Sequence, residues 1–145
     1  MRGALTLRIV AALVPVLTSI ATVDAAPRPA VLEATTKADW QAAGLDGTGC
    51  YWSPRRGGSI HFVAAGNTAM IKVRGRIVVL KPRRDAKALF PFTHDAWRSG
   101  DLTIRVVDTA RIRAMGYETV TTDAALIVTR RDATIRLRGS MICGS

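Results

Sequence analysis

The strongest constraint on the fold of this chain is a period-two alternation of apolar and polar residues that begins after Cys50. Apolar residues occupy every second position in 60–64 and again in 69–73, with Gly66-Asn67 between the two runs. Successive side chains of a strand point to opposite faces, so this spacing predicts half-buried strands. The Gly-Asn pair between them predicts a hairpin.

Further strand patterns fill the rest of the chain. The continuous apolar run 77–80 predicts a more central strand that stops at Pro82. Gly116 is predicted to be a bulge or a break, and Gly139 to turn the backbone before the last run. The later runs are 102–106, 112–114, 126–128, 135–137 and 141–143. Seven or eight short strands predict an all-β fold, a small antiparallel barrel or sandwich with a short N-terminal helix.

The first 25 residues have the layout of a secretory signal peptide. Arg2 and Arg8 give a positive start, residues 9–20 carry no charge, and Val23-Asp24-Ala25 offers small residues at the expected cleavage point. The alternative, a membrane anchor, needs about 20 apolar residues, more than this run supplies. We therefore expect cleavage after Ala25, a periplasmic or secreted protein, and no transmembrane segment in its mature part.

Removal of this segment leaves 120 residues, enough for one small domain with a single core. The predicted organisation is a signal peptide at 1–25, an N-terminal segment at 26–47 and a disulfide-closed β domain at 48–145. Within the N-terminal segment, Thr35 or Thr36 is the expected cap of a short helix over 37–43 that Gly44 ends.

Cys50 and Cys143 are the only cysteines, and an even count in an exported chain predicts a disulfide. Such a bridge would tie the first strand to the last. A metal site or a redox pair is less favoured, because there is no Cys-x-x-Cys motif and no histidine at ligand spacing. We expect no metal and no cofactor.

The mature part keeps 19 of the 21 Lys and Arg and 10 of the 11 Asp and Glu, a net charge of +9. A charge of this size attracts anions. In an exported protein the candidate partners are an anionic envelope polymer, a lipid head group or an acidic protein, whereas a physiological role with nucleic acid is not expected. The competing interpretation is a scatter of solvated surface charges.

Arginines alternate with the apolar strand residues, which places them on the face away from the core. Arginine binds carboxylate or phosphate in a bidentate manner, so convergent arginines would form an anion-binding stripe. A solvated outer face, with arginine stems covering apolar surface, is the alternative. The candidate binding residues of these strands are Arg74, Arg76, Arg105, Arg111, Arg113, Arg136 and Arg138.

The interval 83–100 interrupts the strand pattern and is the one long connection, a length common in functional loops. Trp97 and Arg98 within it are candidate binding residues, since Trp and Arg are frequent at interaction hot spots. Alternatively, its aromatic residues form a flap over one end of the barrel.

Catalytic motifs are absent from the sequence. It has no Gly-x-Ser-x-Gly turn, no His-Glu-x-x-His motif and no phosphate-binding glycine loop. His94 and Asp95 are the only candidates for a small catalytic pair. We therefore predict a protein that is not an enzyme.

The segments Gly49–Trp52 and Met141–Gly144, with a cysteine in the first and the last strand, resemble the small exported β-domain proteins of proteobacteria. The layout is also similar to the membrane-bound inhibitors of c-type lysozyme, periplasmic β-barrels that use a Ser-Gly-x-x-Tyr loop. This resemblance implies an inhibitor of an envelope hydrolase as the alternative function. The nearest fragment, Ser99–Thr103, lacks the tyrosine, and no inhibitory residue is assigned.

Overall fold

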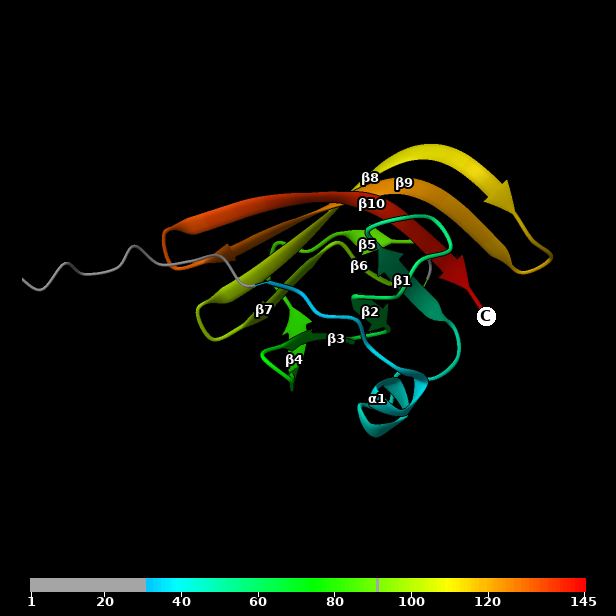
Figure 1. The fold of residues 1–145 in the computed structure, drawn as a ribbon. Helices are drawn as coiled ribbons and strands as arrows, with labels where there is room; N and C mark the ends of the chain where they lie inside the picture. Colours follow the sequence, from blue (N-terminus) through cyan, green and yellow to red (C-terminus); the bar gives the residue numbers. More distant parts are fainter. Residues whose placement is uncertain (1–30, 91) are drawn as a thin grey trace, which may run out of the picture.

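The computed structural model describes residues 31–90 and 92–145, so the predicted signal peptide lies outside the described residues. A closed antiparallel barrel forms the domain, with its strands in the order β1-β10-β9-β8-β7-β4-β3-β2 (Figure 1). The predicted all-β architecture is confirmed, and closure makes it a barrel. The elements are α1 (Lys37–Ala42), β1 (Gly49–Ser53), β2 (Phe62–Ala65), β3 (Thr68–Val73), β4 (Arg76–Pro82), β5 (Ala88–Leu89), β6 (Thr93–His94), β7 (Ala96–Ser99), β8 (Leu102–Met115), β9 (Thr119–Arg130) and β10 (Ala133–Gly144).

Side chains from one face of the barrel strands pack together in the interior and form the main core. Phe62 of β2 lies opposite Ile71 of β3, and both are fully buried in the main core together with Trp52 and Trp97. The hairpin β2–β3 is therefore formed as its alternation predicts. Its other face is buried too, because Val63 and Met70 pack against Leu45 in a second, smaller core cluster.

The helix α1 begins with a capping box. Thr36 Oγ1 accepts a hydrogen bond from the backbone N–H of Asp39, and the Asp39 carboxylate accepts one from the backbone N–H of Thr36. Thr35 instead accepts a hydrogen bond from Nε1 of Trp40 and donates one to the carbonyl of Ile60. These contacts dock the short helix onto the barrel.

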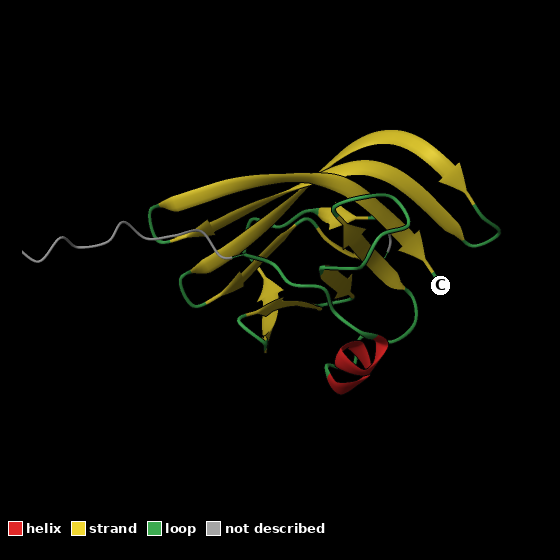
Figure 2. Cartoon of the chain, in the orientation of Figure 1, coloured by secondary structure: helices red, strands yellow, loops and turns green. Residues whose placement is uncertain are grey.

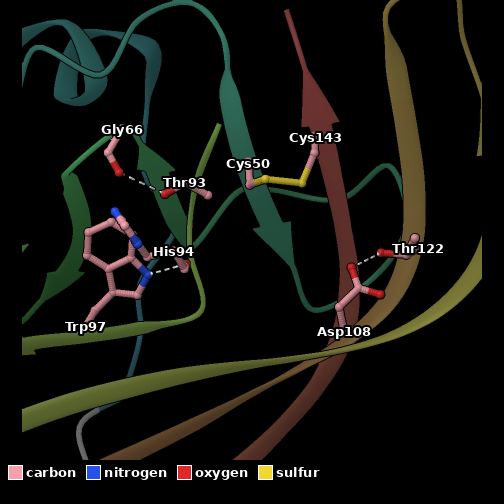
Figure 3. Close-up of a disulfide and its surroundings, with 8 residues drawn as sticks. All are labelled: Cys50, Gly66, Thr93, His94, Trp97, Asp108, Thr122 and Cys143. Carbon is pink, nitrogen blue, oxygen red and sulfur yellow. Dashed lines mark hydrogen bonds between the residues drawn. A yellow bond between two sulfur atoms is a disulfide. The ribbon is translucent and has the colours of Figure 1, made fainter. Parts of the chain in front are cut away.

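The disulfide forms between Cys50 and Cys143, as predicted. The two residues face each other directly across β1 and β10, with their Cα atoms 4.1 Å apart (Figure 3). Both are buried, and the bridge joins the first strand of the sequence to the last. It therefore covalently secures one seam of the closed barrel.

The last three strands are longer than the alternation indicates (Figure 2). The runs 102–106 and 112–114 belong to one strand, β8, whose register with β9 shifts between Asp108 and Ile112. The bulge lies there, whereas Gly116 lies in the turn between β8 and β9. An extra length of chain within a paired strand interrupts the period, which is why one strand looks like two.

The predicted turn at Gly139 is wrong. This residue lies inside β10 and pairs with Ala124 of β9, so 135–137 and 141–143 belong to a single strand. A glycine is needed there because the backbone carbonyl of Ser53 and the ring of Trp52 occupy the space in which a side chain would lie. The glycine therefore marks a close packing contact rather than a change of chain direction.

The prediction of one long connection over 83–100 is also wrong. The interval contains the small β5–β6 hairpin and the barrel strand β7. β7 is short, and its pattern is hidden because Ala96 and Trp97 are both fully buried. Two neighbouring buried residues remove the alternation that would have revealed a strand.

Candidate functional site

A basic groove lies where β4 meets β7. These strands pair over only two positions, Lys81 with Arg98 and Pro82 with Trp97. Around this seam lies a groove of about 1060 Å³, here called the β7 groove. Its lining residues are Lys81, Pro82, Arg83, Arg84, Asp85, Arg98, Gly100 and Thr103.

Only some of the charged side chains around the β7 groove have a partner of opposite charge. Asp85 accepts hydrogen bonds from Arg83 and Arg105, and the bond from Arg83 is the main reason why the pKa of Asp85 lies below its ordinary value. Among the described residues, Lys81, Arg84 and Arg98 form no salt bridge. Three positive charges thus remain without a carboxylate partner.

Lys81 and Arg98 are directly opposite each other on neighbouring strands. Both are exposed, because the residues beside them, Leu80 and Trp97, point into the core. Nζ of Lys81 donates to Oγ1 of Thr68 at 3.3 Å, and Nε of Arg98 donates to the carbonyl of Gly100 at 3.2 Å, so both groups are hydrogen-bonded but neither has an anionic partner. Like charges directly opposite each other on paired strands repel and are destabilising. An anion bound between them would remove that repulsion.

A second basic region surrounds Asp123 on β9. Arg113 donates to the Asp123 carboxylate from Nε at 2.7 Å and, as the largest cause, holds the pKa of Asp123 below its ordinary value. Arg56 and Arg111 lie close enough to lower it further. Arg136 and Arg138 line a depression of about 450 Å³ next to the same aspartate. We call these five arginines, 56, 111, 113, 136 and 138, the arginine cluster.

The two basic regions both lie on the outer surface of the barrel. Arg98 of β7 pairs with Thr103 of β8, and Arg105, two residues along β8, is aligned through Ile127 with Arg136 of β10. The core-facing residues between them, such as Ile104, are buried. With strands about 4.8 Å apart, the three strand spacings from β7 to β10 separate the regions by about 15 Å.

The other sequence-predicted residues have different positions. Arg105 is bonded to Asp85 and Asp95, so its charge is already compensated. Arg74 and Arg76 lie at the turn between β3 and β4 and line neither basic region. Of the predicted stripe, only Arg111, Arg113, Arg136 and Arg138 therefore come together in one region.

The candidate role of Trp97 in binding is not supported by its position. Its side chain is fully buried, and Nε1 donates a hydrogen bond to the carbonyl of His94 at 2.9 Å (Figure 3). Its ring packs edge-on against Phe62 in the core. Trp97 is thus a structural residue that holds β7, while Arg98 beside it faces solvent.

Sequence reasoning missed Lys81, Arg83 and Arg84 in the groove and Arg56 in the cluster. The run Lys81-Pro82-Arg83-Arg84 was visible as a basic segment at the end of a predicted strand. Its proximity to Arg98 depends on the pairing of β4 with β7, which no local pattern reveals.

His94 and Asp95 do not form a hydrogen-bonded pair. Nε2 of His94 lies 2.8 Å from the side-chain oxygen of Asn67, whereas the Asp95 carboxylate accepts from the backbone of Lys87 and from Arg105. Across residues 31–90 and 92–145, no group of three potential metal ligands comes together. The described part of the chain also contains no helix with the length and apolar character to cross a membrane.

Comparison with known proteins adds no relative: no family model, no curated protein and no solved structure matches the chain.

Proposed function

We propose that this protein is an exported, non-enzymatic domain that binds an anionic polymer of the cell envelope across the outer face of β4, β7, β8, β9 and β10. The observation that carries the proposal is the like-charged pair Lys81 and Arg98, placed directly opposite each other in the β7 groove with no carboxylate partner among the described residues. The export signal expected in residues 1–25 supports the envelope as the place of action.

A polymer is favoured over a small anion because the face has two basic regions. A small anion would occupy either the β7 groove or the arginine cluster, whereas a chain of acidic sugars or phosphates reaches both. The separation of about 15 Å requires several repeating units. Arginine donors suit both carboxylate and phosphate groups.

The test uses polygalacturonate as a carboxylated polymer and neutral dextran of similar length as its control. We expect binding to polygalacturonate alone, and a large loss of affinity between 0.1 and 1 M salt, because the screening length falls from about 10 Å to about 3 Å. Short galacturonate oligomers that cannot span the two regions should bind more weakly per sugar unit.

Two double variants with equal loss of charge separate site binding from general attraction. Lys81→Gln with Arg98→Gln removes the opposed pair, and Arg74→Gln with Arg76→Gln removes two charges at the β3–β4 turn. The first should weaken binding much more than the second. Equal weakening would show that net charge alone attracts the polymer, and would contradict a defined site.

An acidic protein is the competing occupant of this face. Polyglutamate of matched charge serves as its probe. Preference for polyglutamate over polygalacturonate, with the same dependence on Lys81 and Arg98, would transfer the proposal from a polysaccharide to a peptide partner.

Inhibition of an envelope hydrolase stays the second proposal, carried by the resemblance in sequence layout alone. The Ser99–Thr103 fragment spans the turn from β7 to β8, where the carboxylate of Asp101 is already engaged by Arg131 at 3.2 Å. A lysozyme activity assay with the purified protein tests it directly, and inhibition at a stoichiometric ratio would support it.

A further inference from the structure

Another pocket lies beside the first half of β10. β1 pairs with β10 only from Gly49 opposite Gly144 to Ser53 opposite Ser140, so residues 133–139 of β10 pair with β9 alone. A pocket of about 310 Å³, here called the β10 pocket, lies beside this half of the strand. Its lining residues are Val31, Leu32, Trp52, Pro54, His61, Ile135, Arg136, Leu137 and Arg138.

The wall opposite β10 is the segment that precedes α1. Leu32 is buried in the main core, and its carbonyl lies 3.0 Å from Nδ1 of His61. A carbonyl only accepts hydrogen bonds, so Nδ1 carries the hydrogen. Glu33 and Thr35 bond through their backbone N–H groups to Lys72 and Ile60. The wall is thus held in place by several bonds, and the pocket is largely preformed.

The floor and sides of the β10 pocket are apolar. Ile135 and Leu137 face the barrel interior and pack against the main core, yet both stay partly exposed. Trp52, almost fully buried, contributes to the same lining. An apolar group bound here would bury surface that the fold itself leaves accessible, which is a favourable change.

The polar contribution to the pocket is positive. Arg136 and Arg138 lie at alternate positions of β10 and contribute to the lining of the β10 pocket. Neither forms a salt bridge within the described ranges, since the neighbouring Asp123 is bonded to Arg113. The lining contains no carboxylate. A largely apolar pocket with a few charged groups at its edge is a usual form of a small-molecule site.

We propose that the β10 pocket binds a small amphipathic anion, with its apolar body against Leu32, Trp52 and Leu137 and its single anionic group at Arg136 and Arg138. A medium-chain carboxylate matches this chemistry. The site shares no lining residue with the β7 groove, whereas Arg136 and Arg138 belong both to this pocket and to the arginine cluster of the proposed polymer-binding face.

Isothermal titration with decanoate tests the proposal, with acetate and 1-decanol as controls for charge alone and for the chain alone. Decanoate should bind with a sub-millimolar dissociation constant and both controls much more weakly. No saturable decanoate binding, or equally tight binding of 1-decanol, would overturn the proposal.

Variants distinguish the contribution of the apolar lining to decanoate binding from that of Arg136 and Arg138. Leu137→Trp fills the pocket without changing any charge and should abolish decanoate binding, with Ile135→Phe as a second blocking variant if the first fails to fold. Arg136→Gln with Arg138→Gln should weaken decanoate about tenfold or more, since each charged hydrogen bond contributes strongly, and should leave 1-decanol unchanged. Arg74→Gln is the matched arginine control, and its decanoate affinity should equal that of the original protein.

The experiment also distinguishes a free anion from a membrane lipid. Vesicles of phosphatidylglycerol present the same combination of chain and charge in a bilayer. Binding to these vesicles without binding to free decanoate would overturn the proposal that the β10 pocket binds a free anion. Decanoate binding that Lys81→Gln with Arg98→Gln leaves intact would support the pocket even if polymer binding by the β7 groove failed.

Discussion

The indole of Trp52 lies directly against the backbone of Gly139, so closely that a Cβ built on the glycine would fall 2.6 Å from Cζ2 of the tryptophan. Trp52 is almost fully buried, and its Nε1 donates a hydrogen bond to the carbonyl of Ala124 at 3.1 Å. Ala124 is the residue paired with Gly139 across β9 and β10. One aromatic side chain from β1 therefore connects the interior faces of both long strands.

The substitution Gly139→Ala should destabilise the barrel. The added methyl group meets the backbone carbonyl of Ser53 and a ring that is held by its own hydrogen bond, and overpacking of this kind costs about 1–3 kcal/mol. Arg138→Ala, at the adjacent exposed position, should change the free energy of unfolding by no more than about 0.5 kcal/mol. Urea denaturation of the two variants measures the difference, and equal values would show that the Trp52 contact is easily relaxed.

Reduction of the Cys50–Cys143 bridge should lower the stability markedly. The bridge spans 93 positions of sequence, and loss of a native disulfide in a small domain costs about 2–5 kcal/mol because the unfolded chain regains conformational freedom. Thermal unfolding with and without dithiothreitol measures the change. The double variant Cys50→Ser with Cys143→Ser is the control and should not respond to the reductant, and an unchanged transition in the original protein would contradict the prediction.

Stability should fall in acid partly through Asp123. Its pKa is lowered below 3.8 in the folded protein, chiefly by the hydrogen bond from Arg113. The unfolded state then binds more protons in this range, so the contribution is present above the ordinary pKa and is lost as the pH falls through the folded value. Denaturation midpoints between pH 6 and pH 2.5 should decline less steeply for Asp123→Asn. Parallel curves for the two proteins would refute this assignment.

Asp95 should contribute more to stability than a surface aspartate. Its carboxylate accepts from the backbone N–H of Lys87 at 2.7 Å and from Arg105 at 3.3 Å, and only 18% of its side chain is exposed. Asp95→Asn should cost about 1–3 kcal/mol. Asp101→Asn breaks the exposed pair with Arg131 and should cost about 0–1 kcal/mol. A cost for Asp95→Asn no greater than that for Asp101→Asn would contradict this prediction.

The elements with regular patterns were predictable. The alternation of β2 and β3 and the capping residues of α1 are local signals, because side-chain direction and cap hydrogen bonds depend on near neighbours in sequence. β7 was missed because Ala96 and Trp97 are both buried, and β8 was divided in two because its register shifts after Asp108. For the two basic regions, the sequence predicted that arginines face outward but did not predict which of them lie close together.

The sequence by itself determined that this chain forms strands with one apolar face, that two cysteines are available to join the first strand to the last, and that the outer surface is strongly positive. Only the tertiary structure decided that Lys81 meets Arg98, that Arg105 is compensated by Asp85 and Asp95, and that Leu32 and Leu137 line one pocket. Strand order brings together residues that are distant in the sequence, and the alternation within each strand carries no information about its neighbour. The composition therefore sets the net charge, and the closure of the barrel decides which positive side chains lie close enough together to bind an anion.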